Sequence, residues 1–450
     1  MAVSMRQNRI RIGYGLLAIL LVLTSGCSGS GPRLREVPAS IKIACCDQRT
    51  FDSQYLDFMQ TVYPNTRFDL IPLNDPVYYQ DGSDQALKRT LEEANPDLVI
   101  LNPRMYRSAA DQGLLSNLEQ YAKRHGFDLA PLSASMLDVA RNNQDGKLFG
   151  LCPIFRAFAV FYNKSLFQRY GVTLPDREMS WDELLQLASR FANPTDLEIG
   201  TIGLHVIGIQ QPYDLMNLIA LTEGLQVYDR STDRLLFDSD GWRKLIFDIV
   251  AVYRNGTFPS ISGDNNLQDG VVTKEDMERS DLFGQGRAAM AIAGSETLSR
   301  YEQQKLPFEW GLLPGPVQTR DRGKGGFIQV DTLFGIPNNS AHSEEAWRII
   351  ASLMSEVTGK VYTALDSGLS VYEQAVGWRQ NPDYEAFYKL RPELMPVDPL
   401  STTVRTQIAT LVNQAIVNAI NGDTTVEDAI AAMQDKGKML FLGGQVQSIH

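Results

Sequence analysis

A regular alternation of short apolar runs and helical segments between residues 41 and 101 constrains the fold most strongly. Residues 41–46 and 68–71 have the composition of strands, and residues 87–94 have that of a helix. The next run, 97–101, reads Asp-Leu-Val-Ile-Leu, and its nearly continuous apolar character is typical of a strand buried on both faces. Strands that alternate with helices in this way predict an α/β fold with a largely parallel sheet.

Polar residues directly follow two of these predicted strands. Asp47 follows the first strand, and Asn102 and Arg104 follow the third. In parallel α/β sheets ligands gather beyond the carboxyl ends of the strands, so these three residues are candidates for a binding site. Turn and cap chemistry explains the same residues without a ligand, and for Asp47 the two interpretations are equally well supported.

Residues 281–294 join a flexible, charged half to a half made almost entirely of Ala, Met and Ile. Gly284 and Gly286 give the first half backbone freedom, and Gly294 ends the apolar run. This pattern predicts a turn or helix end that leads into a short buried strand. Further on, Ser180 and Glu183 have the spacing of a capping box at the start of a helix.

The N-terminus has the organisation of a bacterial export signal. Three arginines within the first eleven residues form a basic segment, and residues 14–23 form an apolar segment too short for a comfortable membrane span. Small residues then precede Cys27, as at the cleavage site of a lipoprotein signal peptidase, with Thr24 where Leu is usual. We expect cleavage before Cys27, a lipid on its sulfur and a flexible tether after it. An ordinary secretory signal or a short anchor helix is the alternative.

Length and charge restrict the function further. The chain has 450 residues, and this length predicts two or three domains or one large two-lobed unit. Hydrophobic residues make up 44% of the chain, which is enough for a packed core, and the formal net charge is −11. Removal of residues 1–26 would remove three arginines and no acidic residue, which takes the net charge to about −14. An acidic exported protein is a poor candidate for binding nucleic acid.

Cysteine and histidine show no metal-binding pattern. After Cys27 the chain has Cys45, Cys46 and Cys152, so at most one disulfide can form among these three. A bridge between Cys46 and Cys152 is one arrangement that disulfide geometry would allow. The four histidines are scattered and no Cys/His spacing fits zinc, so we expect no metal site.

Motifs of the familiar enzyme classes are absent from the sequence. It contains no G-x-S-x-G, no Walker loop and no H-E-x-x-H. The glycine-rich run 323–326 lacks the spacing and the following Ser/Thr of a phosphate loop, which favours a mobile turn. The sequence contains many carboxylates, so their number alone does not exclude a pair suited to glycoside hydrolysis. The sequence chemistry favours binding over catalysis.

Several motifs occur in an order that resembles one known family. Residues 281–294 resemble the F-x-x-G-x-A-A-M…G signature of family 1 extracellular solute-binding proteins, which serve ABC importers. Further landmarks occur in the family's order at residues 96–99, 113–115, 145–153, 162–164, 180–184, 335–337, 345–347 and 421–429. The similarity spans about residue 40 to residue 435 and lies behind the lipoprotein-like N-terminus.

The resemblance implies an α/β, two-lobed periplasmic-binding-protein-like fold of type II, with the ligand cleft between the lobes. Chain crossings between the lobes are implied near 150–156, 293–297 and 331–337. Gly294 would then let the chain leave a buried strand at the cleft, and Arg287 would lie on the surface. We therefore expect a signal peptide at 1–26, the lipidated cysteine and tether at 27–39, a first lobe from 40–152 plus 295–333, and a second lobe from 153–294 plus 334–450.

The maltose-type members of the family allow a residue-by-residue comparison of the pocket. Arg156 stands where that branch has a sugar-contacting carboxylate, and Gln211-Pro212-Tyr213 resembles a Glu-Pro-Tyr whose tyrosine stacks on sugar. Core packing is the alternative for Tyr213. Gln329 and Asp331, near the third crossing, are further candidates, with a hinge role as the alternative.

Other positions depart from the maltose-type pattern. Glu296, Ser401 and Leu101 stand where stacking tryptophans are found, so Tyr213 alone is retained among the stacking residues. Arg104 and Arg156 could hold a carboxylate by forked hydrogen bonds, or could form surface or interlobe ion pairs. A uronate-containing oligosaccharide is one hypothesis for the ligand; a neutral sugar, a glycerophosphodiester or another polar solute stays open. The candidate ligand-binding residues are Asp47, Asn102, Arg104, Arg156, Gln211, Tyr213, Glu296, Gln329 and Asp331.

The resemblance implies a membrane-tethered, extracytoplasmic receptor that captures a solute, most simply a carbohydrate, closes its lobes by a hinge motion and delivers the solute to an ABC permease. The ATPase of the partner would supply the energy, so we expect no cofactor, no catalytic residue and a monomeric protein. Three alternatives stay open: a sensory protein that signals to a membrane kinase, a secreted carbohydrate-active enzyme, and a structural surface lipoprotein.

Overall fold

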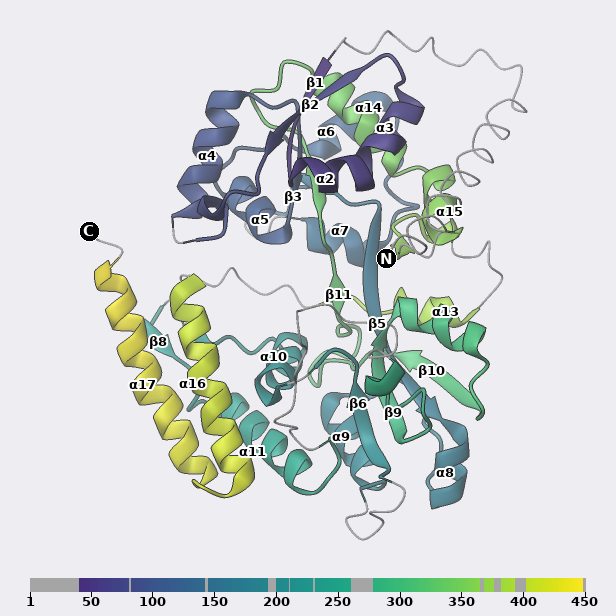
Figure 1. The fold of residues 1–450 in the computed structure, drawn as a ribbon, viewed down its shortest axis with the longest axis vertical. Coiled ribbons are helices and arrows are strands. Elements are labelled where there is room, and N and C mark those ends of the chain that lie inside the picture. The colour runs from purple at the N-terminus through teal and green to yellow at the C-terminus, as the bar shows by residue number, and fades with distance from the viewer. Residues whose placement is uncertain are drawn as a thin grey trace.

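The computed structural model describes residues 40–80, 82–141, 145–192, 200–209, 211–229, 231–259, 278–364, 368–375, 382–392 and 402–447. It confirms the expected two-lobed α/β architecture: each lobe has its own β-sheet and its own helices, and the lobes lie one above the other in Figure 1. The predicted signal peptide, Cys27, the tether and Ser401 lie outside the described residues.

The first lobe contains a five-stranded sheet in the order β2-β1-β3-β12-β4. β1 pairs in parallel with β2 and β3, whereas β12 pairs antiparallel with β3 and β4. All four residues of β3 are buried, as the apolar run at 97–101 predicts. The strands are β1 (Ser40–Cys45), β2 (Arg67–Pro72), β3 (Leu98–Leu101), β4 (Gly150–Leu151) and β12 (Leu333–Gly335).

Several helices of the first lobe bury an apolar stripe, and α4 is an example. In α4, Leu87 and Leu91 are buried, and their spacing of four residues places them on one face. Asn95 then ends α4 in the left-handed conformation, with φ of 48°. The helical elements are α2 (Gln48–Phe51), η1 (Asp52–Leu56), α3 (Asp57–Val62), η2 (Pro76–Tyr78), α4 (Ser83–Ala94), α5 (Pro103–Asp111), α6 (Leu118–His125), α7 (Ala134–Ala140), α14 (Ser343–Leu353) and α15 (Glu356–Ala364).

The second lobe contains a sheet with the strand order β10-β5-β9-β6 and a small hairpin of β7 and β8. β5 pairs antiparallel with both β9 and β10, and only β6 and β9 run in parallel. The expected parallel arrangement therefore holds for β1, β2 and β3 but not around β5, because the neighbours of β5 come from distant parts of the chain rather than from consecutive strand–helix–strand units. The strands are β5 (Ile154–Asn163), β6 (Ile202–Val206), β7 (Tyr228–Asp229), β8 (Arg234–Leu235), β9 (Ala288–Gly294) and β10 (Trp310–Pro314).

β9 confirms the prediction for the apolar half of residues 281–294. All seven of its residues are buried, and Arg287 just before it is exposed. Small side chains suit this position because β9 lies between β5 and β6 and is covered on both faces. One face belongs to a hydrophobic core that continues into the first lobe, and the other faces the core of the second lobe.

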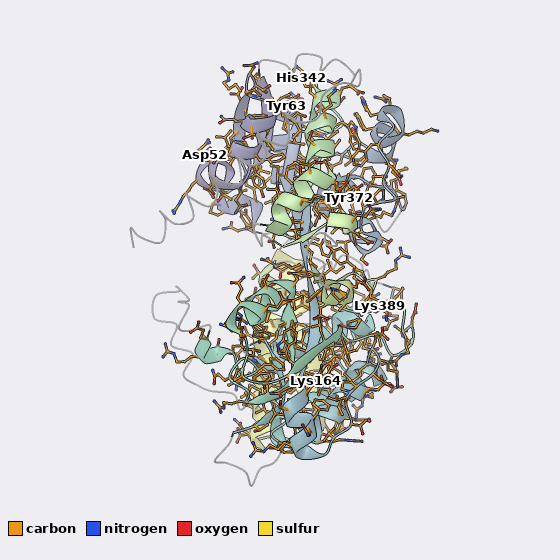
Figure 2. All side chains as sticks on the ribbon, turned by 90° about the vertical axis from the view of Figure 1, so that its right-hand side faces the viewer. Asp52, Tyr63, Lys164, His342, Tyr372 and Lys389 are labelled. Carbon is orange, nitrogen blue, oxygen red and sulfur yellow. The ribbon has the colours of Figure 1, made fainter. Side chains whose placement is uncertain are left out.

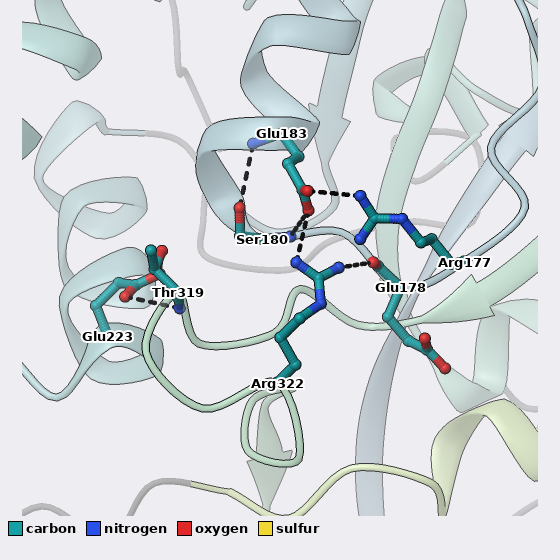
Figure 3. A network of polar contacts seen from close by, with 7 residues as sticks. All are labelled: Arg177, Glu178, Ser180, Glu183, Glu223, Thr319 and Arg322. Atoms are coloured by element: carbon teal, nitrogen blue, oxygen red, sulfur yellow. Dashed lines mark hydrogen bonds and ion pairs between the residues drawn. The ribbon is translucent and has the colours of Figure 1, made fainter.

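Helices of the second lobe cover its sheet, and the long pair α16 and α17 packs along α11 (Figure 1). The predicted capping box at the start of α9 is confirmed: the Ser180 amide donates to Glu183 Oε2 at 2.8 Å, and the Glu183 amide donates to Ser180 Oγ at 3.3 Å (Figure 3). The helical elements are α8 (Lys164–Tyr170), α9 (Trp181–Ser189), α10 (Pro212–Glu223), α11 (Asp240–Arg254), α13 (Ser295–Gln304), η5 (Pro382–Phe387), α16 (Thr402–Asn421) and α17 (Val426–Gln447).

The chain crosses between the lobes at β4 to β5 and again at β11 (Ile328–Gln329) to β12, in agreement with the expected crossings near 150–156 and 331–337. β11 and β13 (Leu369–Ser370) both pair with the first half of β5, so three strands run between the lobes. Figure 2 shows the lobes from the side, with Tyr372 on the first and Lys389 on the second.

The predicted lobe boundaries need correction in the middle of the chain. No crossing occurs at 293–297: Gly294 is the N-cap of α13, and α13 packs back onto β5 and β9. The segment 295–333 therefore lies mostly in the second lobe, because β10 joins the second sheet. Conversely, β12 joins the first sheet and α14 packs against α6, so the early part of 334–450 belongs to the first lobe.

Candidate functional site

The carboxyl edge of the first sheet faces the β11–β12 crossing. β12 begins at Leu333, which is paired with Leu101 at the end of β3, so Asn102 and the segment before Leu333 lie at the same edge. A hydrogen bond of 3.3 Å between the hydroxyl groups of Tyr55 and Thr332 joins the crossing to the helical segment after β1. This edge is where an α/β sheet presents its loops to a ligand.

Three predicted residues meet at this crossing. Arg156 on β5 lies opposite Gln329 on β11, and its Nη2 donates to both carboxylate oxygens of Asp331 at 2.7 and 2.8 Å. Gln329 Nε2 donates to Asp331 Oδ1 at 3.3 Å. The Arg156 and Asp331 side chains are 39% and 64% exposed, so solvent reaches the pair. We call Arg156, Gln329 and Asp331 the crossing cluster.

An aromatic pair lies beside the crossing cluster. Phe158 stands two residues after Arg156 and therefore points to the same face of β5. Its ring centroid is 5.0 Å from that of Phe327, and both side chains are half-buried. The sequence reasoning missed these two residues, although the spacing of two from Arg156 was a usable signal for Phe158.

Glu296 lies near Phe158 of β5, because its carboxylate covers Gly294, the residue paired with Phe158. A Cβ placed on Gly294 would lie 2.4 Å from each carboxylate oxygen of Glu296, so the carboxylate folds back over the Gly294 backbone. Gly294 is paired with Phe158, and Glu296 is exposed. A side chain at position 294 would therefore force the exposed Glu296 carboxylate to move to another rotamer.

Gln211 and Tyr213 lie at the start of α10, in the second lobe. Asn413 of α16 holds both: its Nδ2 donates to Gln211 Oε1 at 3.0 Å, and its Oδ1 accepts from the Tyr213 amide at 3.4 Å. The Tyr213 ring is half-buried against the core of the second lobe. The sequence reasoning missed Asn413, because its role depends on the packing of α16 on α10.

Arg104 is tied to its own lobe. Its Nη2 donates to the Tyr78 carbonyl at 2.6 Å and to Ser83 Oγ at 2.8 Å, and Nη1 lies 3.5 Å from Asp84. These contacts hold the start of α4 against α5. Tyr79, 48% exposed, lies within electrostatic reach of the Arg104 guanidinium.

Asp47 and Asn102 both act as helix caps. Asp47 caps α2, since its carboxylate accepts from the Thr50 hydroxyl at 2.7 Å and from the Thr50 amide at 3.0 Å. These two hydrogen bonds, the hydroxyl first, lower the pKa of Asp47 below its ordinary value. Asn102 caps α5 by accepting from the Met105 amide at 2.9 Å. For Asp47, Asn102 and Arg104 the structure thus supplies the structural role that the sequence left as the alternative.

Neither a metal centre nor a membrane span is found in the described part of the chain. Within those residues, His, Cys, Asp and Glu never gather in threes in a way that could hold a metal ion. Across the same residues, every helix is too short or too polar to span a bilayer.

The chain matches the family model described as bacterial extracellular solute-binding protein over residues 64–360, more than half of its length. A binding protein of Brucella abortus is 26% identical over 68% of this chain and 71% of the relative. A mannitol-binding protein of Pseudomonas aeruginosa is 22% identical over 78% of this chain and 88% of the relative. Among solved structures, the sugar-binding protein MalE of Xanthomonas citri superposes with a TM-score of 0.65 at 15% identity, covering 91% of this chain and 99% of that one.

The chain therefore belongs to the bacterial extracellular solute-binding protein family and has the two-lobed fold of periplasmic solute-binding proteins. Its family consists of binding proteins rather than enzymes and acts outside the cytoplasm. The resemblance carried by residues 281–294 and the other ordered motifs is confirmed.

Proposed function

We propose that this chain is the solute receptor of an ABC importer and that it binds a neutral carbohydrate or sugar alcohol between its lobes. Family membership supports the receptor role. The names of the mannitol-binding relative and of the structurally similar sugar-binding protein support the ligand class.

The crossing cluster is the observation that carries this proposal. A hydroxyl group both donates and accepts, so one polyol can accept from Arg156 or Gln329 and donate to Asp331 at the same time. A solute carboxylate would have to compete with Asp331 for the Arg156 guanidinium. The paired state of Arg156 therefore favours a neutral polyol over the uronate hypothesis.

Aromatic surface completes the proposed pocket. Sugars bind through apolar ring faces as well as through hydroxyl groups, and Phe158 with Phe327 offers such a face next to Arg156. Tyr213 in the first turn of α10 and its N-cap Gln211 would contribute further contacts, and Glu296 would contribute a further acceptor. Contacts that a solute makes with both lobes would favour the closed arrangement, since only differential contacts can shift that equilibrium.

The N-terminus supplies the proposed membrane attachment. Lipidation of Cys27 after removal of 1–26 would anchor a monomeric receptor at the extracytoplasmic face of a membrane. Mass spectrometry of the protein extracted from membranes should find cleavage before Cys27 and a lipid on its sulfur, and size-exclusion chromatography of a chain that begins at Ser28 should give a monomer. A mature N-terminus that carries no lipid on Cys27 would contradict the lipid anchor.

Calorimetric titration of the purified full chain with D-mannitol, maltose and D-glucuronate tests the receptor proposal. We expect saturable binding of a neutral polyol or sugar, and about 2.7 kcal/mol of added stability at a ligand concentration one hundred times Kd. Arg156→Ala should weaken this binding. Arg67→Ala is the matched control, because Arg67 forms an exposed ion pair with Asp69 on β2.

Other outcomes of the titration separate the alternatives. Binding without any defect in uptake when the chain is deleted from cells would favour a sensory role. Turnover of a saccharide, abolished by replacing one carboxylate, would favour an enzyme. Absence of binding across a broad library of neutral and acidic solutes would contradict the receptor proposal and favour a structural lipoprotein.

A further inference from the structure

Two adjacent cysteines lie at the carboxyl end of β1, on the edge of the first lobe that faces the crossing. Cys45 is buried and Cys46 is half-buried. Their Sγ atoms are 2.7 Å apart, closer than ordinary contact between two non-bonded sulfur atoms. A disulfide bond of about 2.05 Å would need a further approach of the sulfur atoms and a torsional adjustment of the Cys45–Cys46 link, because the Cα atoms of neighbouring residues are only about 3.8 Å apart.

The surroundings place this pair next to the interlobe strands. Burial raises the pKa of the Tyr55 hydroxyl, and negative charge on the cysteine pair raises it further, so the pair lies within electrostatic reach of Tyr55. The same Tyr55 hydroxyl bonds to Thr332, the residue after Asp331 of the crossing cluster. A chemical change at the cysteines would therefore occur close to the crossing, with Tyr55 between them.

The two thiols differ in reactivity. The hydrogen bond from the Cys45 thiol stabilises a Cys46 thiolate, which lowers the pKa of Cys46, and the same bond raises the pKa of Cys45. Because the thiolate is the nucleophile, the half-buried Cys46 is the sulfur that an oxidant meets first. Cys152 is fully buried and burial raises its pKa, so it should be the least reactive of the three.

We propose that Cys45 and Cys46 form a vicinal disulfide in the extracytoplasmic environment, by exchange with an oxidised small-molecule or protein disulfide. The Cys46 thiolate attacks one sulfur of the oxidant and releases the other as a thiol. Cys45 then loses its proton and attacks the Cys46 sulfur of the mixed disulfide, which releases the second thiol. The two cysteines are oxidised by two electrons, and the incoming disulfide is reduced to two thiols. The crossing edge of the first lobe thereby becomes a redox-modifiable site.

Peptide mapping of the full chain tests the proposal. The protein is treated with oxidised glutathione, alkylated under denaturing conditions and digested with trypsin, which should cut after Lys42 and Arg49. We expect peptide 43–49 without any alkyl group and lighter than its dithiol form by two hydrogen atoms. Peptide 148–156, which contains Cys152, should carry one alkyl group. Prior reduction should restore two alkyl groups on peptide 43–49.

Two variants keep the test specific. Cys152→Ser should leave the vicinal bond intact, whereas Cys46→Ser should leave Cys45 unable to form it. Linkage of peptide 43–49 to peptide 148–156 would show a Cys46–Cys152 bridge instead and would overturn the proposal. Two alkyl groups or two glutathione molecules on peptide 43–49 after oxidation would overturn it as well. Neither result depends on whether the chain binds a sugar.

Discussion

Arg104 and Arg156 carry the same guanidinium group, and both are equally exposed at 39%, yet their surroundings differ. Arg104 donates to a backbone carbonyl and to the buried Ser83 within one lobe, and its contact with the Asp84 carboxylate is longer, at 3.5 Å. Arg156 pairs with the exposed side chain of Asp331, which lies in the segment between β11 and β12 that leads from one lobe to the other. Hydrogen bonds to a backbone carbonyl and to a buried hydroxyl hold an arginine in place and stabilise the fold. An exposed carboxylate partner, in contrast, can also form hydrogen bonds with a ligand.

The largest effect that this comparison predicts is on stability. Arg104→Ala should lower the free energy of unfolding by about 2 kcal/mol, because two hydrogen bonds from a charged donor are lost and the Ser83 hydroxyl keeps no such donor. Urea denaturation measures the loss, and calorimetry should find ligand affinity within twofold of the native protein. Normal stability combined with lost binding would reverse the assignment.

The second effect is on affinity. Arg156→Ala should weaken binding of the neutral ligand by at least about tenfold, which is about 1.4 kcal/mol. Its effect on unfolding should stay below about 1 kcal/mol, since an exposed ion pair contributes little. Asp331→Asn, which keeps an acceptor but removes the charge, should lose less affinity. If Arg156→Ala binds normally, the crossing cluster serves only as a hinge contact.

A third variant tests whether the edge of the first lobe is built from caps. Asn102→Ala should cost about 1 kcal/mol of stability because the Met105 amide loses its acceptor. Asn102→Asp should retain the stability, since Asp caps as well as Asn does. Thermal denaturation of the two variants side by side makes the measurement. An affinity loss in both variants without a stability loss in Asn102→Ala would make Asn102 a ligand residue.

The smallest expected effect is a pH dependence within the second lobe. The Ser180 amide, then Arg177 and Arg322, hold the pKa of Glu183 at about 2, below the ordinary 4.5 (Figure 3). A lowered folded pKa means stability that is present above about 4.5 and is lost as the pH falls towards 2. The loss should stay below about 1 kcal/mol because the side chain is 35% exposed and solvent screens it.

Denaturation midpoints between pH 5 and about pH 2.5 measure the Glu183 contribution. Glu183→Gln should make stability depend less on pH in this range, because the variant side chain cannot take up a proton. An identical slope in the native protein and in Glu183→Gln would contradict the assignment. Arg67→Ala, remote from α9, is a suitable control.

Local chemistry made much of the fold predictable. The apolar run at 97–101 predicts buried β3, and the Ser180–Glu183 spacing predicts the cap of α9, because each depends on neighbouring residues only. The prediction of a crossing at 293–297 was wrong for the opposite reason. The residues near Gly294 do not determine whether the chain leaves the lobe or folds back as α13. Sheet membership of β10 and β12 depends on partners more than a hundred residues away.

The candidate site was predictable to a similar extent. The resemblance picked out Arg156, Gln329 and Asp331, which do lie together. It could not foresee that Arg156 meets Asp331 directly, since the two are 175 positions apart in sequence. Asn413 and Phe327 were missed because their roles arise only from the packing of α16 on α10 and of the segment before β11 on β5.

The length of β5 has a mechanical consequence. Its first half is hydrogen-bonded to β11 and β13, and its second half to β9 and β10, so one ten-residue strand belongs to the scaffold of the second lobe while it carries the link to the first. Pulling the lobes straight apart would load this ladder along its stiffest direction. Twisting near its start, where β4 gives way to β5 and β11 to β12, changes only a few backbone torsions. The arrangement of β5 therefore favours rotation of one lobe against the other over a separation of the two lobes.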